Sequence, residues 1–427
     1  MGIKNLNTFL KQNTNSENIF RLVPTRDFYA CRIAVDATNR FYALWSQAYR
    51  IVVERTDVCY EEPSLAEAEV LFYTLVKQFL VKMIDCQCTP ILVFDGKHPE
   101  EKFKTQQDRR EKKQVAKNKI IELRDTINKI DVLERTLDMG RQLKKLYCQN
   151  VSPPYGIFKR IQVLLSELGF PSFQAKDEAE QLCCMMCLDG YASAVMSTDT
   201  DVLVYSCSLL ITGFGSGIYN PQTRSYDSQF TCVYLNSILK ELNMSQSTFV
   251  DFCIMCGCDY NTNMSKIASG NSYKLITRHG SIDQLPSKYD ISCLNHEFCR
   301  ERFKPRKSLD VSDSQFEMSD LNVKVDMWKS ETVGEDGSDS DPKTAIQILK
   351  QNDLTDWYPD LSRCVKFLPT PNSGIVIQRP TTTIPFKLKV SAASCSSFSS
   401  SSSSASSSSN SSSPHDFIDS MIADLLN

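Results

Sequence analysis

The sequence predicts an α/β fold, in which helices flank a mostly parallel, twisted sheet. Short apolar runs alternate with helical patterns, and several of these runs end in an acidic residue. Alternating strands and helices favour a parallel sheet, because each helix carries the chain back across one face. The carboxyl ends of parallel strands share one edge, so we expect the acidic residues to gather there.

The first two expected strands are Ile33 to Val35 and Ile91 to Phe94, and an aspartate follows each directly. Between them, residues 65–84 carry apolar side chains at the spacing of an amphipathic helix. The segment therefore predicts a strand, a helix and a second strand, with Asp36 and Asp95 at the strand ends.

A third strand is expected from Ala192 to Met196, after a helical pattern over residues 179–188. Asp199 and Asp201 follow this strand, and on an extended segment their side chains would point the same way. Within a helix, Glu178 and Glu180 would diverge by about 200°. We therefore expect these glutamates at the first turn, where the geometry is freer.

Together the chain holds seven acidic residues of this kind: Asp36, Asp95, Glu178, Glu180, Asp199, Asp201 and Asp259. Two unit negative charges about 4 Å apart repel by roughly 4 kcal/mol at an effective dielectric near 20. A fold that converges them needs a compensating cation. Oxygen-only ligands suit Mg²⁺ or Mn²⁺, and two such ions can hold both the attacking and the leaving oxygen of a phosphodiester.

Residues 99–147 are charged and helical, with apolar side chains at three-and-four spacing: Ile120, Leu123, Ile127, Ile130 and Leu137. From Lys97 to Arg124 there are ten Lys and Arg against five Asp and Glu, although the net charge of the chain is -3. One interpretation is a solvated helix or coiled coil. The other is a helical arch whose basic part faces an anionic substrate.

The C-terminal part has a different composition. Residues 310–342 hold ten acids and two lysines, and 17 of the 23 residues at 391–413 are serine. Such a serine segment cannot bury a core, so we expect a disordered tether. Residues 414–427 have apolar side chains at helical spacing, which predicts a short amphipathic helix that docks on an unknown protein partner.

No run of eighteen apolar residues occurs, and the N-terminus lacks the pattern of a signal peptide. We expect an intracellular protein that is neither secreted nor bound to a membrane. Many of the 17 cysteines lie in apolar segments, which is typical of reduced, buried thiols. A zinc site built from the clusters at residues 183–187 and 253–258 is a weaker alternative, because paired knuckles in polar loops are missing.

The motifs resemble those of the flap endonuclease family of structure-specific 5′ nucleases. The resemblance rests on six segments in the order of the family: MGIKNL, VDATNRFY, VFDGKHPEEK, DEAE, STDTD and GCDYNTN. They span residues 1 to about 290, and the segment after Asp259 is similar to versions encoded by large DNA viruses. The resemblance implies that Asp36, Asp95, Glu178 and Glu180 hold one metal ion, and that Asp199, Asp201 and Asp259 hold or support a second.

The resemblance also assigns roles to basic and aromatic residues. Lys102 and Arg109, seven residues apart and so on one helix face, would contact the scissile phosphate. Further nucleic-acid contacts are implied for Gly2, Tyr42, Lys112, Lys113, Lys266 and Ser269. Without the motifs, a solvated charged face and a core tyrosine would be the simpler interpretations, although Phe41 can fill that core position.

Two family features differ. Where the family's helix-hairpin turn has a Gly-Ile-Gly-Pro type sequence, this chain has Lys266-Ile267-Ala268-Ser269, which leaves potassium binding open. The clamp-binding motif with paired aromatic residues is not evident. The expected segments are an N-terminal nuclease region (1–98), the arch (99–150), a second nuclease region with the helix-hairpin (151–290), an acidic region (291–390), the serine linker (391–413) and the terminal helix (414–427).

These inferences predict a metal-dependent nuclease that cuts 5′ flaps or 5′ ends of branched DNA in replication, repair or recombination. It would act in the nucleus or at a cytoplasmic replication site. Two alternatives are an RNA-degrading nuclease of the same superfamily and an inactive nucleic-acid-binding scaffold. The seven carboxylates argue against the scaffold, because it has no reason to tolerate their mutual repulsion.

Overall fold

The computed structural model describes residues 2–306 except residues 98, 132–134, 169, 221–224 and 265–266. Within this part the α/β class is confirmed. The predicted serine linker, the terminal helix, most of the acidic region and Lys266 lie outside the described residues. In the part of the chain that is described, no helix is long and apolar enough to cross a membrane.

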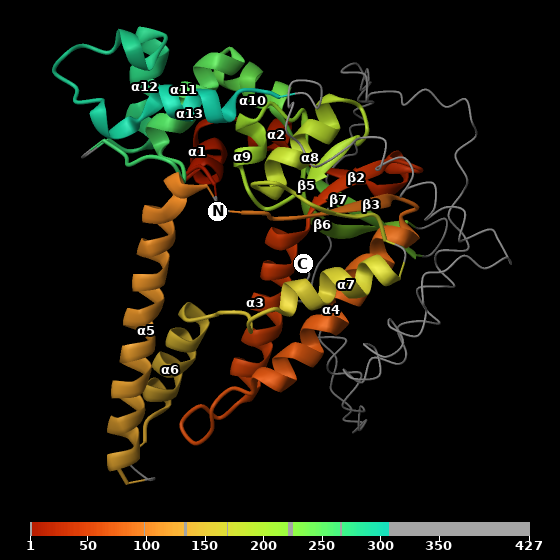
Figure 1. Ribbon diagram of the computed structural model, residues 1–427, viewed down its shortest axis with the longest axis vertical. Coiled ribbons are helices and arrows are strands. Elements are labelled where there is room, and N and C mark those ends of the chain that lie inside the picture. Colours follow the sequence, from red (N-terminus) through yellow and green to blue (C-terminus); the bar gives the residue numbers. More distant parts are fainter. Residues whose placement is uncertain are drawn as a thin grey trace, which may run out of the picture.

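A seven-stranded sheet forms the centre of the described part, in the order β1-β7-β6-β5-β2-β3-β4. Figure 1 shows helices on both sides of this sheet. The strands are β1 (Phe20–Pro24), β2 (Arg32–Asp36), β3 (Thr89–Phe94), β4 (Ser172–Gln174), β5 (Ala194–Met196), β6 (Leu209–Asn220) and β7 (Ser225–Tyr234). The β2 strand pairs in parallel with β3 and β5, and β3–β4 and β5–β6 are also parallel. The remaining pairs, β6–β7 and β7–β1, are antiparallel.

The predicted strands β2, β3 and β5 lie side by side in the middle of this sheet. Their apolar residues are buried on both faces. Ile33 and Val35 face one hydrophobic cluster, whereas Ala34 between them faces the other. Such burial on both faces produces the continuous apolar runs from which these strands were predicted.

Helices cover both faces of the sheet. One cluster holds residues of α3 (Ala37–Arg55), α4 (Leu65–Asp85), α6 (Leu137–Gln149) and α7 (Ile157–Glu167). The other holds residues of α1 (Leu6–Asn13), α2 (Ser16–Ile19), α8 (Ala179–Leu188), α9 (Asp201–Val204), α10 (Leu235–Leu242), α11 (Gln246–Cys256), α12 (Ser269–His279) and α13 (His296–Phe303). The sheet is therefore the middle layer of three.

The helix α5 (Phe103–Lys129) and its neighbour α6 project from these layers, side by side (Figure 1). The apolar pattern continues through Ile130 and Leu137, but the helix does not. Ile130 is extended, and α6 begins at Leu137, where the Thr136 side chain accepts a hydrogen bond from Met139 N. Leu137 is 83% exposed, so its place in the pattern was coincidental.

The projecting pair is fixed to the rest of the protein by packing and by polar contacts, among them those of Arg124. Ile127 of α5 and Tyr147 of α6 belong to the hydrophobic cluster that contains α3. Arg124 Nη1 donates to Tyr147 Oη at 2.9 Å and to Glu61 O at 3.2 Å. A fully solvated helix is therefore ruled out for this half of α5.

Gly96 provides a test of how tightly the strand ends are packed. A Cβ at this position would overlap the carbonyl oxygens of Ala175 and Lys176, whereas a Cβ at Gly270 in α12 would meet nothing within 4 Å. We expect Gly96→Ala to lower the free energy of unfolding by about 1–3 kcal/mol. The control Gly270→Ala should be neutral or slightly stabilising. Urea unfolding measures both, and equal values for the two variants would contradict this packing.

Candidate active site

Two aspartates are fixed at neighbouring strand ends. Asp36 ends β2, and its carboxylate accepts hydrogen bonds from Asn39 N at 3.1 Å and Ser197 Oγ at 2.9 Å. Asp95 follows β3, and its Oδ1 accepts from Ala179 N at 2.8 Å. Because β2 and β3 are parallel neighbours, both carboxylates lie at the same edge of the sheet, as expected.

Glu178 and Glu180 begin α8. Glu178 is the residue before the helix, and Glu180 lies in its first turn, in agreement with the expectation from their spacing. Both side chains are buried and close to Lys102. The Lys102 ammonium forms an ion pair with Glu178 and lies 3.8 Å from Glu180 Oε1. Tyr260 donates a hydrogen bond from its hydroxyl to the other oxygen of Glu178.

Asp199 and Asp201 converge by a different route from the predicted one. The chain turns after β5 instead of staying extended, and Asp201 is the first residue of α9. Asp199 Oδ1 accepts a hydrogen bond from Asp201 N at 3.0 Å, which stabilises this turn. One oxygen from each of Glu180, Asp199 and Asp201 lies within 4.8 Å of the others.

The buried carboxylates lack sufficient positive charge among the described residues. Burial, and then the charge of Asp95, raise the pKa of Asp36 to about 8. The pKa of Asp201 is raised well above its usual value by burial and then by Asp199. Asp201 Oδ1 is buried and has no hydrogen-bond partner among the described residues. An oxygen-only donor set with an unsatisfied buried oxygen fits a hard divalent cation.

A cavity of about 460 Å³ connects these groups with the basic part of α5. Six of the seven predicted carboxylates line it (Asp36, Asp95, Glu178, Glu180, Asp199 and Asp259), together with Tyr42, Lys102, Arg109, Lys112 and Lys113. Asp201 lies behind them in the protein interior, 1% exposed. Ser269 begins α12 and is not among the residues that line this cavity.

Lys102 and Arg109 both contact Asp259. The Lys102 ammonium lies 3.4 Å from Asp259 Oδ2, and Arg109 Nη2 lies 2.9 Å from Oδ1 and 3.0 Å from Oδ2. Burial lowers the pKa of Lys102, but Glu180 and then Glu178 outweigh this effect, and the pKa is raised overall. Lys102 is therefore a permanently charged side chain, 8% exposed, at the floor of the cavity.

The N-terminus and Tyr42 complete the walls of the site. Gly2 adopts a positive φ of 85°, and a Cβ there would overlap Asp199 and Thr200, so only glycine allows this close approach. Phe41 is fully buried, whereas Tyr42 lines the cavity. Lys113 Nζ lies 5.6 Å from the centroid of the Tyr42 ring.

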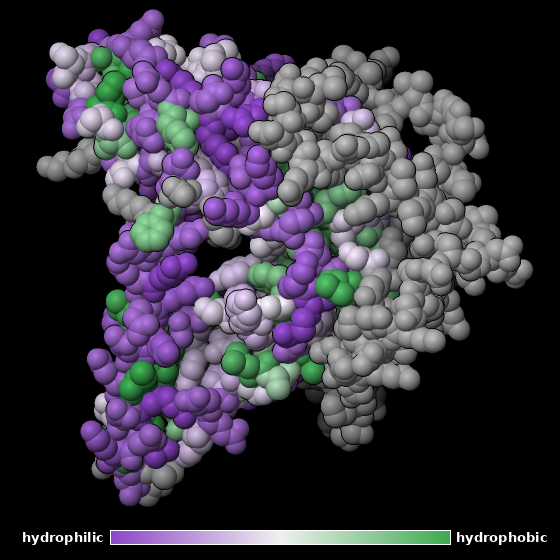
Figure 2. All heavy atoms as spheres, viewed as in Figure 1, coloured by the Kyte–Doolittle hydropathy of each residue, from purple (hydrophilic) through white to green (hydrophobic). Residues whose placement is uncertain are grey.

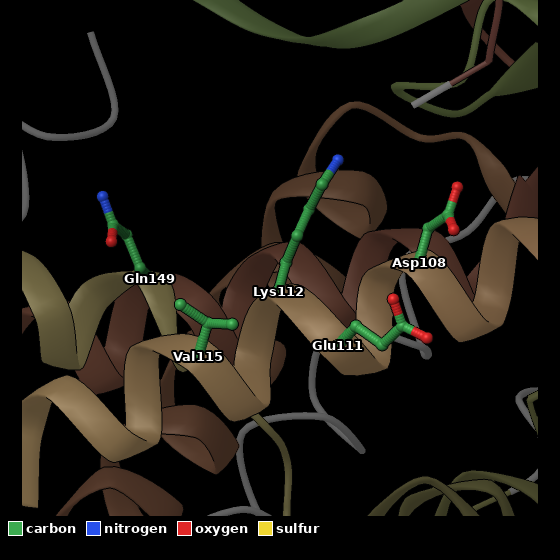
Figure 3. A pocket seen from close by; sticks show the side chains of 5 residues that line it. All are labelled: Asp108, Glu111, Lys112, Val115 and Gln149. Carbon is green, nitrogen blue, oxygen red and sulfur yellow. The ribbon is translucent and has the colours of Figure 1, made fainter.

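A second cavity, of about 640 Å³, extends the first along α5 and α6. It is lined by Asp108, Glu111, Lys112, Val115 and Gln149, and Figure 3 shows the Lys112 and Asp108 side chains rising from the same side of α5. Lys112 and Gln149 line both cavities. Figure 2 shows a hollow beside α5 that is bordered mainly by hydrophilic residues.

Several supporting residues were not predicted. Ser197 donates to Asp36, Thr105 Oγ1 donates to Asp259 O at 2.9 Å, and Tyr260 donates to Glu178. The segments STDTD and GCDYNTN contain Ser197 and Tyr260, but nothing in their local pattern indicates partners 161 and 82 residues away. Among the described residues, the two cysteine clusters supply no group that could hold a metal ion, and the described cysteines are free thiols.

Comparison with known proteins agrees with this geometry. Residues 1–116 match the XPG N-terminal domain, and residues 169–259 match the XPG I-region. A probable RAD2-like endonuclease, 369L, of Invertebrate iridescent virus 6 is 27% identical over 356 residues, covering 74% of this chain and 83% of that protein. Flap endonuclease 1 of Glycine max is 27% identical over 407 residues, covering 90% and 95%.

The fold is also that of a solved structure, flap endonuclease-1 from Methanococcus jannaschii. The TM-score is 0.50 at 19% sequence identity, with 83% of this chain and 98% of that chain covered. The matches to the two XPG regions and to curated endonucleases define the class as a phosphodiesterase. The chain belongs to the XPG and flap endonuclease family of structure-specific nucleases, which confirms the resemblance.

Replacement of Asp201 tests whether the acidic cluster is built for a cation. In EDTA near neutral pH we expect Asp201→Asn to raise the free energy of unfolding by about 1 kcal/mol or more. In the unfolded state, Asp201 releases its proton above the ordinary pKa of 3.8, whereas the raised pKa favours the protonated form in the folded state. Near neutral pH this difference in pKa destabilises the folded wild type. The stabilisation by Mg²⁺ should be largely lost in the variant.

Thermal unfolding in EDTA and in Mg²⁺ measures both effects. Asp125→Asn, an exposed substitution on α5, is the control and should change neither. An equal Mg²⁺-induced rise of the unfolding temperature in the Asp201 variant and the wild type would contradict the prediction.

Proposed function

We propose that this protein hydrolyses phosphodiesters at 5′ flaps or 5′ ends of branched DNA, with two Mg²⁺ ions that Mn²⁺ can replace. The observation that carries the proposal is the meeting of two sets of groups at one cavity. Acids from the ends of β2 and β3, from α8, the α9 turn and the segment after α11 face Lys102, which precedes α5, and Arg109 of α5. We assign Asp36, Asp95, Glu178 and Glu180 to one ion, and Asp199, Asp201 and Asp259 to the other.

The metal ions would supply a water nucleophile active near neutral pH and positive charge for the transition state. Lys102 and Arg109 would bind and orient the scissile phosphate. Arg109 Nη2 donates to both oxygens of Asp259, and the planar guanidinium has the fork geometry that suits two phosphate oxygens. Lys102 adds a charge that burial protects from screening by salt.

Other residues would hold the nucleic acid near the cut. Tyr42 presents an aromatic ring at the cavity, which a nucleobase can stack on. Lys112 and Lys113 offer charge for backbone phosphates along the path toward the second cavity. Gly2 lies close to Asp199 and would place the α-amino group near the same site after removal of Met1. We assign Ser269 and Lys266 to the duplex beyond the cut.

The proposed role is in DNA replication, repair or recombination, in the nucleus or at a cytoplasmic replication site. The buried carboxylates disfavour an inactive scaffold, since their repulsion has a cost that binding alone does not require. The alternative function is cleavage of RNA in place of DNA, and the first experiment below distinguishes the two.

The first test uses labelled 5′-flap DNA, nicked duplex, single-stranded DNA and RNA. We expect Mg²⁺-dependent cleavage near the flap junction, no cleavage in EDTA, and none by Asp199→Ala, which removes a buried oxygen donor while leaving the cations of α5 in place to bind DNA. Gel analysis of the products measures the rate and the cut position. Equal cleavage by Asp199→Ala points to a contaminant, and faster cleavage of RNA favours the RNA-degrading alternative.

The second test concerns the two cations. Lys102→Ala and Arg109→Ala should each lower the single-turnover rate about a hundredfold, because each removes a donor to the charge of the transition state. Binding of flap DNA, measured by fluorescence anisotropy in Ca²⁺, should weaken much less. Lys117→Ala is the matched control, since Lys117 is an exposed cation on the same helix. A rate within twofold (about the error of such assays) of that control would exclude Lys102 or Arg109 from the site.

A further inference from the structure

The helix α13 contacts the acidic site although it lies beyond both matched family segments. Those segments end at residues 116 and 259, whereas α13 spans His296–Phe303. Figure 1 shows α13 beside α11. Its Arg302 side chain is largely buried, with 12% of its surface exposed, and it points toward the residues around Glu178.

Arg302 contacts two residues next to Glu178, one on each side of it. Its Nη1 lies 3.2 Å from Asp177 Oδ2, and Asp177 directly precedes Glu178 in the chain. Its Nε donates to Tyr260 Oη at 3.5 Å, and the guanidinium lies 5.8 Å from the centroid of the same ring. Tyr260 in turn donates its own proton to Glu178. A chain of hydrogen bonds thus runs from Arg302 through Tyr260 to the carboxylate.

The direction of these hydrogen bonds matters for Glu178. An arginine side chain only donates, so Tyr260 Oη accepts from Arg302 and its proton is directed to Glu178. The other oxygen of Glu178 pairs with Lys102. The Lys102 ammonium in turn lies 5.0 Å from the centroid of the Tyr260 ring. Both oxygens of the carboxylate are therefore oriented by groups that converge on Tyr260.

The contact with Asp177 fixes a loop that positions two carboxylates. Gly96 N donates to Asp177 O at 2.7 Å, and Lys97 N donates to Lys176 O at 2.9 Å. This loop leads into Ala179, whose N–H donates to Asp95. An arginine that holds Asp177 therefore stabilises the junction between the end of β3 and the start of α8.

A separate set of contacts anchors α13. Arg300 forms two hydrogen bonds with the buried Asp251 of α11, at 2.6 and 2.7 Å. Phe303 packs against the rings of Tyr205 and Tyr260, with centroids 5.2 and 5.7 Å apart. Arg302 is thus presented from a helix that is already held in place by neighbours other than Glu178.

We propose that Arg302 is a positioning residue for the metal site, acting through Tyr260 and Asp177 to hold Glu178. The inference rests on the proposed function, because it assumes that Glu178 is a metal ligand. Arg302 itself contacts no predicted metal ligand directly. Its loss is expected to weaken metal binding and turnover more than it weakens the fold.

The test measures Mn²⁺ binding to the full-length protein by electron paramagnetic resonance, without DNA. We expect Arg302→Leu to raise the Kd for Mn²⁺ about tenfold. Arg302→Lys, which can reach one of the two partners but not both, should raise it about threefold. Tyr260→Phe removes only the hydroxyl and should weaken binding similarly. The double variant Arg302→Leu with Tyr260→Phe should lose less affinity than the two single losses combined, because both variants act on the Tyr260 hydrogen bond and only Arg302 also holds Asp177.

Arg300→Leu is the matched control, since it removes an arginine of the same helix that contacts Asp251 instead. It should lower the unfolding temperature and leave the Kd for Mn²⁺ within about twofold. An equal loss of Mn²⁺ affinity in the Arg300 and Arg302 variants, or additive losses in the double variant, would overturn the proposal. If Arg302→Leu does not fold, the Arg302→Lys and Tyr260→Phe variants and their combination decide by the same criteria.

The experiment also separates this inference from the proposed function. A wild type that binds no Mn²⁺ contradicts the proposed metal-dependent activity. A wild type that binds Mn²⁺, with Arg302→Leu binding equally tightly, contradicts only the role of Arg302.

Discussion

Buried carboxylates repel one another, and this repulsion constrains every element around the cavity. The three strand ends and the start of α8 bring acids into a region where burial, and then the charge of a neighbouring carboxylate, raise the pKa of Asp36 and Asp201. Hydrogen bonds from Ser197, Asn39 and Ala179 orient individual oxygens but do not neutralise their charge. The carboxylates are therefore stable as a set of anions only with added positive charge. The side chain of Lys102 supplies part of this charge, and divalent cations can supply the rest.

The side chain that supplies charge lies where the projecting helix begins. Lys102 is the residue that precedes α5, and within the next seven residues Thr105 and Arg109 contact Asp259 as well. The first two turns of α5 are thus attached to the acidic cluster by charge, and its second half is attached to α6 by apolar packing. The cations of the helix therefore lie at the cavity, and its far end packs in the hydrophobic core.

Much of this could be predicted from the sequence, for a physical reason. Strands β2, β3 and β5 are buried on both faces, so their apolar runs are continuous and their final acids are easy to recognise. The turn from Asp199 into α9 was missed, because a spacing of two residues fits a strand and a tight turn equally well. The contacts of Lys102 and Tyr260 with Glu178 join residues 76 and 82 positions apart, beyond the reach of any local pattern. The resemblance to a known family, and not periodicity, assigned a role to Lys102.

The distribution of family matches along the chain has a structural explanation. All seven carboxylates fall within residues 1–116 or 169–259, the segments that match the family models. Strand ends fix the positions of these oxygens, so the acidic centre depends mainly on the sheet and on the turns that leave it. Residues between the two segments form the far half of α5, α6 and α7, and Gln149 at the end of α6 lines both cavities. The walls along which a nucleic acid would approach are therefore built partly by a segment that holds none of the seven acidic residues.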